Sequence, residues 1–372
     1  MKFSVSSTEL LKKLQIVGGA IASNPVMPIL EDFLFVLDQR TLTISASDLE
    51  TTITTKLDVA GEGKGNVAIP ARILMDTLKA LPGQAITISV NEENFGIEIT
   101  SSFGKYRLAG ENGLDFPQQP VPDGVDAISL SALALSHGIN KTIFATSNDD
   151  LRPAMTGVLF QVDFTKLTLV ATDAHKLVKY SYRDLSGEVS TSFIVPKKTL
   201  NLLKNALPAD DTVVEMAFNK SNVFFTFGDT TLIGRLIDGR YPDYNGVIPV
   251  GNPNLLSISR VEFQNSLRRI AIYANKTTNQ VILNISSGNL TVSAQDLDFA
   301  NEATEALPCH FDGNPLTIGF NAKFLVEMLG VLESDDVKME LATSSRAGIL
   351  LPAEQDEKEE ILMLVMPVML TN

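Results

Sequence analysis

The chain has 372 residues, of which 44% are apolar and 20% charged, and its 30 Lys and Arg against 44 Asp and Glu give a net charge of −14. This composition excludes a disordered or fibrous protein and predicts a globular chain of two or three domains. The acidic balance excludes a protein that grips nucleic acid over its whole surface, because neutralising phosphates requires Lys and Arg. A basic surface confined to one face of the protein is still compatible with that balance.

The chain carries no sign of secretion or membrane insertion. Its single cysteine, Cys309, excludes an internal disulfide and a cysteine-based metal site, which is typical of a reducing compartment. The first residues contain no apolar core of a signal peptide, and no apolar run approaches the roughly 18 residues of a membrane span. We therefore expect a cytoplasmic protein with no membrane partner.

The sequence repeats itself with a period of about 125 residues, and each copy opens with a strand followed by a helix. Residues 3–6, 128–131 and 256–259 alternate apolar residues with Ser, as in a half-buried strand. The last serine of each set (Ser6, Ser131 or Ser259) is placed to cap the next helix. Apolar residues at helical spacing then predict helices over residues 7–23, 131–147 and 259–276.

Each copy continues with a strand that ends in an acidic turn, at Asp48, Asp173 and Asp296. A second helix follows over residues 71–81, 197–207 and 321–332, and after it comes alternating sequence typical of strand hairpins. The pattern predicts an α+β fold: three tandem copies of a two-helix, antiparallel-sheet module, with the helices packed on one face of the sheet. Turn-rich segments place the domains at residues 1–123, 124–252 and 253–372.

The predicted helices concentrate the positive charge of this acidic chain. Five of the six carry a net charge of +1 to +3 and the sixth is neutral, so the helices sum to +9 and the rest of the chain to −23. A positive helical face within a negative exterior is suited to transient, sequence-independent contact with the phosphates of a polyanion. The cations expected on that face are Lys12, Lys13, Arg72, Lys79, Lys141, Lys197, Lys198, Lys204, Arg268, Arg269 and Lys276.

Catalytic motifs are weak by comparison. The sequence lacks a phosphate-binding glycine loop, and His137, His175 and His310 lack metal-ligand spacing, so we expect no metal, no cofactor and no enzyme activity. The sharpest enzymatic alternative is a hydrolase that uses Asp173 and His175, which lie close together after a strand. Against it, Asp173 has repeat counterparts without a matching histidine, which indicates a structural turn residue.

Four separated segments resemble the bacterial sliding-clamp family, the beta subunits of DNA polymerase III. Pro25-Val-Met-Pro-Ile-Leu30 is similar to the family's P-x-x-P-I-L, and Ala171-Thr-Asp-Ala-His-Lys-Leu177 to its A-T-D-G-H-R-L. Arg240-Tyr-Pro-Asp-Tyr244 resembles R-[FY]-P-D-Y, and Leu364-Val-Met-Pro-Val368 resembles the terminal V-M-P. The resemblance implies a ring of two subunits joined head to tail, with helices lining a hole that holds duplex DNA and sheets outside.

The resemblance also implies a processivity factor for DNA replication. Its partners would be the replicative polymerase catalytic subunit, the clamp loader, and repair polymerases and other proteins with a short Gln/Leu/Phe-type motif. A peptide cleft between the second and third domains would take that motif. The residues that the resemblance assigns to this cleft are Arg152, Met155, Thr172, His175, Lys176, Leu177, Pro242, Val247, Asn321, Phe324, Ser345, Met366, Pro367 and Val368.

Two further implications concern the ring and the cleft. The homodimer would close by a domain-one edge strand with Tyr106 and Leu108 meeting Ile272 and Tyr273 of domain three. Ala174 departs from the family's usual Gly, and Met369 stands where relatives often have Arg, so cleft specificity is expected to differ. A repeat scaffold that never touches DNA remains the alternative compatible with the net charge.

Overall fold

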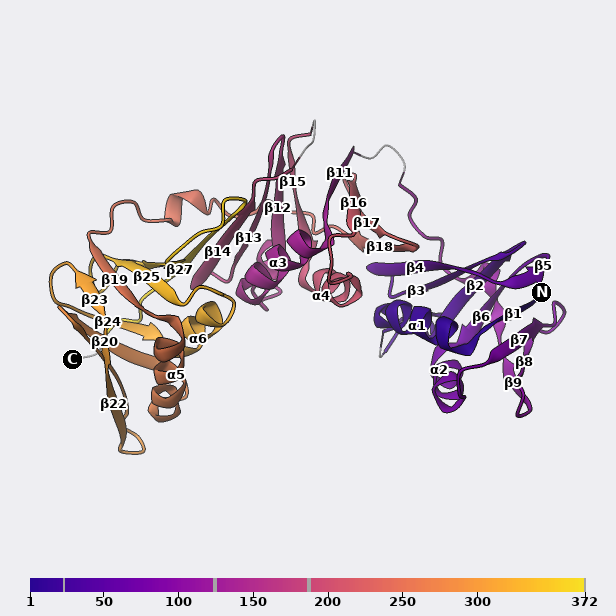
Figure 1. The fold of residues 1–372 in the computed structure, drawn as a ribbon, viewed down its shortest axis with the longest axis horizontal. Helices are drawn as coiled ribbons and strands as arrows, with labels where there is room; N and C mark the ends of the chain where they lie inside the picture. Colours follow the sequence, from indigo (N-terminus) through magenta and orange to yellow (C-terminus); the bar gives the residue numbers. More distant parts are fainter. Residues whose placement is uncertain (23, 123–125, 186–188, 371–372) are drawn as a thin grey trace. The chain divides into compact units, whose positions relative to one another are not determined.

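The computed structural model describes residues 1–22, 24–122, 126–185 and 189–370 (Figure 1). The chain divides into two compact units: unit 1 is Met1–Leu135 with Lys198–Leu236, and unit 2 is Ser136–Lys197 with Ile237–Asn372. The second sequence repeat is therefore shared between the units. The predicted border between residues 123 and 124 lies outside the described residues, as do Thr371 and Asn372.

Unit 1 contains two sheets. The five-stranded sheet has the order β5 (Ala60–Glu62), β1 (Lys2–Ser6), β7 (Ala85–Val90), β8 (Gly96–Thr100) and β9 (Lys105–Ala109). The nine-stranded sheet has the order β10 (Glu111–Asn112), β6 (Lys64–Pro70), β2 (Asp32–Asp38), β3 (Thr41–Ser47), β4 (Thr51–Asp58), β18 (Thr230–Arg235), β17 (Asn222–Phe227), β16 (Val213–Phe218) and β11 (Asp126–Ser131).

Unit 2 repeats this plan. Its nine-stranded sheet has the order β15 (Thr191–Pro196), β12 (Gly157–Asp163), β13 (Lys166–Thr172), β14 (Lys176–Tyr182), β27 (Glu359–Val365), β26 (Gly348–Pro352), β25 (Asp336–Leu341), β19 (Asn254–Ser259) and β23 (His310–Asp312). Its four-stranded sheet has the order β22 (Asn301–Pro308), β21 (Asn289–Asp296), β20 (Gln280–Ser286) and β24 (Leu316–Asn321).

Both large sheets cross a repeat border. In unit 1, β4 of the first repeat pairs with β18 of the second, and in unit 2, β14 of the second repeat pairs with β27 of the third. Both pairings are antiparallel, and backbone hydrogen bonds continue from one module into the next. We refer to the β4–β18 and β14–β27 borders as the first and second junctions.

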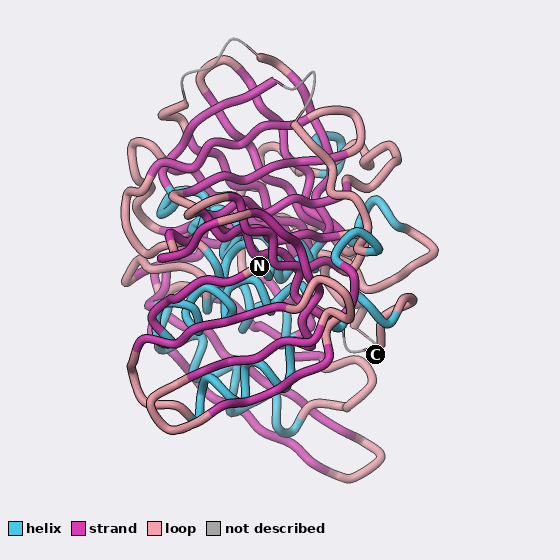
Figure 2. Tube along the Cα trace, turned by 90° about the vertical axis from the view of Figure 1, so that its right-hand side faces the viewer, coloured by secondary structure: helices cyan, strands magenta, loops and turns pink. Residues whose placement is uncertain are grey.

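The helices predicted from the repeat all form, and within each unit they pack beside the sheets. They are α1 (Ser7–Val17), α2 (Ala71–Ala80), α3 (Ala132–Thr142), α4 (Lys197–Ala206), α5 (Arg260–Ile270) and α6 (Ala322–Gly330). In unit 1, α1 contacts α2, β3 and β4, whereas in unit 2, α5 contacts α6, β21 and β22 (Figure 1). Figure 2 shows more strand than helix along the trace, with the helices as short segments. The predicted α+β class is confirmed.

The capping serines confirm the predicted helix starts. Ser6 accepts a hydrogen bond from the backbone N–H of Glu9, and Ser259 accepts one from that of Glu262. Ser131 accepts from the N–H groups of residues 133 and 134. Each hydroxyl satisfies an N–H that the first helical turn leaves unpaired.

The first helix of each copy is shorter than the apolar spacing predicts. α1, α3 and α5 end at residues 17, 142 and 270, and each continues as a single 3-10 turn: η1 (Gly18–Ala20), η4 (Ile143–Ala145) and η7 (Ala271–Tyr273). At α1 the cause is local, because Gly18 and Gly19 have poor helix propensity. Lys276 consequently lies beyond α5, where its Nζ donates to the carbonyl of Ile272 at 2.9 Å.

Candidate functional site

The turn between β13 and β14 carries much of the predicted cleft. Asp173 Oδ1 accepts the backbone N–H groups of His175 and Lys176, both at 2.9 Å, and so closes the turn. Thr172 Oγ1 donates to the Lys176 carbonyl at 2.7 Å and accepts from the Ala174 N–H at 3.1 Å. Asp48 accepts two turn N–H groups in the same way. The prediction that Asp173 is a structural turn residue is confirmed, which counts against the alternative of a hydrolase that uses Asp173 and His175.

The backbone conformation at Ala174 accounts for the Gly of the family pattern at this position. Its φ of 76° lies in the left-handed region, where a side chain costs about 1–2 kcal/mol. Leu49, which follows Asp48, has the same φ. The two turns share one backbone geometry, and in both a residue with a Cβ occupies a position that favours glycine.

We expect Ala174→Gly to leave the free energy of unfolding unchanged or raise it by up to about 1 kcal/mol, since relief of the backbone strain outweighs the greater flexibility of Gly in the unfolded chain. Urea denaturation measures the effect. Ala134→Gly, inside α3, is the control and should lose about 1 kcal/mol. An equal loss in both variants would contradict the assignment of strain to Ala174.

Helix α6 faces this turn with Phe324 and Glu327, which are three residues apart and so share one helical face. The Lys176 ammonium lies 3.0 Å from Asp173 Oδ2, 3.3 Å from Glu327 Oε2 and 4.3 Å from the centre of the Phe324 ring. The Lys176 side chain is only 6% exposed. The His175 ring stacks on Phe324 with centroids 6.3 Å apart. These contacts tie the turn to α6.

The C-terminal segment lies beside the same turn. The Met366 N–H donates to the His175 carbonyl at 2.8 Å, and the Val368 N–H donates to the Gly319 carbonyl at 2.8 Å. Pro367 and Val368 are half-buried, and Met366 is exposed. Met369, the departure from the family's usual Arg, points an exposed apolar side chain to solvent at the end of this segment.

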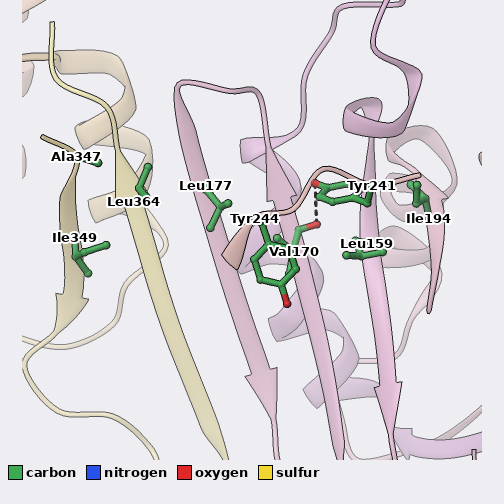
Figure 3. Close-up of a cluster of buried hydrophobic side chains, with 9 residues drawn as sticks. All are labelled: Leu159, Val170, Leu177, Ile194, Tyr241, Tyr244, Ala347, Ile349 and Leu364. Carbon is green, nitrogen blue, oxygen red and sulfur yellow. Dashed lines mark hydrogen bonds between the residues drawn. The ribbon is translucent and has the colours of Figure 1, made fainter. Parts of the chain in front are cut away.

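An apolar cluster occupies the sheet face at the second junction (Figure 3). Its members come from β12, β13, β14, β15, β26 and β27, from the loop before β26, and from residues 236–253 between β18 and β19, which we call the linker. They are Leu159, Val170, Leu177, Ile194, Tyr241, Tyr244, Ala347, Ile349 and Leu364. Tyr241 donates to the Val170 carbonyl at 3.2 Å, the dashed line in Figure 3, and Tyr244 donates to Gln161 Oε1 at 2.5 Å. These two anchors hold the linker across the sheet.

The linker presents two of the predicted cleft residues. Pro242 lies between the anchoring tyrosines and is exposed, and Val247, in η6 (Asn245–Val247), is 58% exposed. Sequence reasoning missed Tyr241, Tyr244 and Val170, although both tyrosines belong to the Arg-Tyr-Pro-Asp-Tyr segment. The pair of tyrosines was the sequence feature that could have found them, because a buried phenolic group usually needs a hydrogen-bond partner.

The other predicted cleft residues make no direct contact with the β13–β14 turn in the interactions of the described residues. Met155 and Arg152 belong to the short η5 turn (Pro153–Thr156) and its cap, whose Ala154 packs against the apolar cluster. Asn321 caps α6 by accepting the Lys323 N–H. Ser345 is exposed in the loop before β26. The contacts of the described residues join Thr172, His175, Lys176, Phe324 and Met366 directly, but do not join Arg152, Asn321 or Ser345 to them.

The predicted helical cations differ in whether a carboxylate lies within ion-pair distance. Among the described residues, no carboxylate lies within ion-pair distance of Lys12, Arg72, Lys204 or Arg268. Each of the following does form an ion pair: Lys13 with Asp229, Lys79 with Asp76, Lys198 with Asp48 and Arg269 with Glu305. Lys197 donates to Asn148 Oδ1 at 3.2 Å.

Lys141 differs most from the expectation of a free helical cation. Its side chain is 14% exposed, and its ammonium lies 2.7 Å from Glu359 and 3.9 Å from Glu333. Glu359 also accepts from His137 Nδ1 at 3.2 Å. Although burial raises the pKa of Glu359, the hydrogen bonds and charges of Lys141 and His137 outweigh it and hold that pKa below its usual range.

The residues predicted to join two subunits lie on free surfaces. Among the described strands, β9 pairs only with β8 and so forms a sheet edge, where Tyr106 and Leu108 are half-buried. In unit 2, Ile272 and Tyr273 of η7 are 65% and 43% exposed. η7 contacts β22, which is the edge of the four-stranded sheet. Unpaired edges and exposed apolar groups are features of association surfaces.

Two features are absent from the part of the chain that the structure describes. No set of three or more His, Cys, Asp or Glu side chains there is arranged to bind a metal ion. No described helix has the length and apolar character needed to cross a bilayer.

Family models match nearly the whole chain. The N-terminal, central and C-terminal domains of the DNA polymerase III beta subunit match residues 1–120, 129–243 and 245–368. The beta sliding clamp of Synechococcus elongatus is 31% identical and that of Vibrio cholerae 29%, each alignment covering 100% of both chains.

A solved structure agrees with these relatives. The sliding clamp of Pseudomonas aeruginosa bound to griselimycin has a TM-score of 0.94 at 29% identity, with 100% of both chains covered. Sliding clamps are non-catalytic processivity factors, so the prediction that the chain is not an enzyme is confirmed. The chain belongs to the DNA polymerase III beta subunit family, the sliding clamps of bacterial replication.

Proposed function

We propose that this protein closes head to tail into a homodimeric ring around duplex DNA in the cytoplasm and tethers the replicative polymerase to its template. The observation that carries the proposal is the placement of charge: an acidic chain keeps Lys12, Arg72, Lys204 and Arg268 on its helices without carboxylate partners. Phosphate attraction of this kind is weak and independent of sequence, which allows sliding. Lys141 is left out of the DNA-facing set because Glu359 and Glu333 neutralise it.

Closure of the ring would join β9 and η7 of two different subunits. β9 carries Lys105 and Arg107, which share the carboxylate of Glu98, and β22 beside η7 exposes Glu302. Opposite charge around an apolar centre favours association of the two surfaces. Because the surfaces differ, such an interface is heterologous and forms a ring when its rotation closes.

The second junction would bind the short Gln/Leu/Phe-type motifs of the replicative polymerase, the clamp loader and repair polymerases. The β13–β14 turn contacts α6 and the C-terminal segment, and the linker packs on the apolar cluster that includes Leu177 of β14. An apolar surface with a few polar groups beside it suits an extended apolar peptide. Griselimycin is bound in the P. aeruginosa clamp structure, and we propose that it binds this chain at the cleft, which makes it a probe for the site.

The DNA proposal predicts retention of the loaded protein on nicked circular DNA and its loss once that DNA is made linear. Reversing Lys12, Arg72, Lys204 and Arg268 to Glu should shorten retention at least about tenfold. It should also reduce the slope of log K against log salt concentration by about 3 to 4, since each lost phosphate contact removes about 0.9. Filter retention of the protein–DNA complex at several salt concentrations measures both.

The matched control reverses Lys2, Lys56, Lys64 and Lys220, which lie on strands or turns and change the net charge equally. This control should stay on circular DNA. Equal loss in both variants would mean that net charge, rather than the helical face, governs binding. Equal retention on circular and linear DNA is the behaviour of a scaffold and would overturn the ring.

A further inference from the structure

The two junctions are built from equivalent parts, yet their contacts differ. The residue three places after the turn Asp is Thr51 at the first junction and Lys176 at the second. The third residue of the following repeat's second helix is Thr199 in α4 and Phe324 in α6. Thr51 and Thr199 hydrogen-bond through their hydroxyls at 2.9 Å and are both buried. At the second junction, the same two places hold a lysine and a phenyl ring, a bulkier pair.

The opposite sheet faces at the two junctions, to which Thr52 and Leu177 point, also differ in polarity. In β3 and β4, Ser45 bonds Thr54 at 2.9 Å and Ser47 bonds Thr52 at 2.8 Å, a ladder of paired hydroxyls. The repeat places Val170 where Ser45 stands and Leu177 where Thr52 stands. The first junction therefore has its polar groups satisfied internally, and the second presents an apolar strip (Figure 3).

The Lys176 ammonium is enclosed by its neighbours. It lies within ion-pair distance of Asp173 and Glu327, and the Phe324 ring centre is 4.3 Å away. The side chain is only 6% exposed, so little of it is open to a ligand. Asp173 lies on the lysine's own turn, so Glu327 is the carboxylate that joins Lys176 to α6, in addition to the Phe324 ring.

We infer that Glu327 is a positioning residue of the peptide cleft: it pins Lys176 against Phe324 and so sets the spacing between the β13–β14 turn and α6. Lys176 then shapes the cleft wall without hydrogen-bonding the peptide. This inference rests on the proposed peptide cleft. It also explains in physical terms why the second junction, and not the Thr51–Thr199 junction, would accept a ligand.

The two possible roles of Lys176 predict opposite signs for one substitution. If Lys176 is a spacer, Glu327→Gln loosens it from α6, and griselimycin should bind about three- to tenfold more weakly. If the ammonium instead bonds the ligand directly, the same change frees a donor and should leave the affinity unchanged or increase it. Calorimetric titration with griselimycin measures the dissociation constant.

A double-mutant cycle separates positioning from a general loss of structure. Lys176→Met and Glu327→Gln should each weaken binding, and the double variant should be no weaker than Lys176→Met alone, because both remove one contact. Glu327→Asp should restore part of the affinity. Glu357→Gln, an exposed glutamate in the β26–β27 loop, is the matched control and should bind as the wild type does.

Each outcome has one meaning. Absence of griselimycin binding to the wild-type chain would overturn the proposed cleft, and the inference with it. Wild-type binding with unchanged or tighter binding by Glu327→Gln would overturn the inference and leave the cleft standing. Additive losses in the cycle would also overturn it. Weaker binding that is not additive supports it.

Discussion

Replacing Ile272 with Asp is expected to convert the proposed dimer into a monomer. Ile272 is 65% exposed on η7, and the proposed ring buries it against β9 of the other subunit. A carboxylate left in that contact without a partner costs several kcal/mol, which weakens the dimer at least about 100-fold. Analytical ultracentrifugation at micromolar concentration measures the mass. Val250→Asp, at an apolar residue of the linker that is 86% exposed, is the control and should remain dimeric.

The head-to-tail arrangement also predicts how a mixture of two variants behaves. Leu108→Asp on β9 should also give a monomer, since it damages the opposite surface. A mixture of the two variants should form dimers again, because one intact η7 surface can meet one intact β9 surface. Failure of the mixture to associate, or an Ile272→Asp protein that stays dimeric, would contradict the proposed closure.

Replacing Glu359 with Gln is expected to lower the free energy of unfolding by about 2 kcal/mol at neutral pH. The change removes the carboxylate that pairs with Lys141 and that accepts from His137 Nδ1. Among the described residues, Lys141 then keeps one ion-pair partner, Glu333, which is 3.9 Å away and largely exposed. A partly buried ammonium without a close partner is costly. Glu333→Gln is the matched control and should lose less than about 1 kcal/mol, as exposed pairs do.

The Glu359 effect should depend on pH in one direction. Because the folded protein holds the Glu359 pKa below the usual value of 4.5, its contribution is complete above that value and is lost as pH falls through the lower folded pKa. The wild-type and Glu359→Gln proteins should therefore differ in urea denaturation at pH 7 and converge at acidic pH. A difference that does not change with pH would show that packing, and not charge, is responsible.

Local rules predicted much of the fold. The capping serines and the turn aspartates act through hydrogen bonds within a few residues, so their roles could be read from spacing alone. Helix ends were less predictable, because the apolar spacing that marks α5 continues through the 3-10 turn of η7. That continuation placed Lys276 on a helix that ends before it.

The site could be predicted only in part, for a physical reason. Motif resemblance supplied Lys176 and Phe324, and the structure brings them together. The Lys141–Glu359 pair joins residues 218 positions apart, and nothing in the local pattern around Lys141 indicates that its charge is neutralised. Pairings such as β14 with β27 depend on the register of distant strands, which helical or strand periodicity does not encode.

The strand pairings at the two junctions bear on how this chain can be divided. A fragment cut at the repeat borders would separate β4 from β18 and β14 from β27, and so leave bare strand edges on both flanks of the central repeat. Such edges are templates for aggregation. The borders of the sequence repeat are thus not the borders of the compact units, and a soluble piece of this protein would have to keep a junction intact.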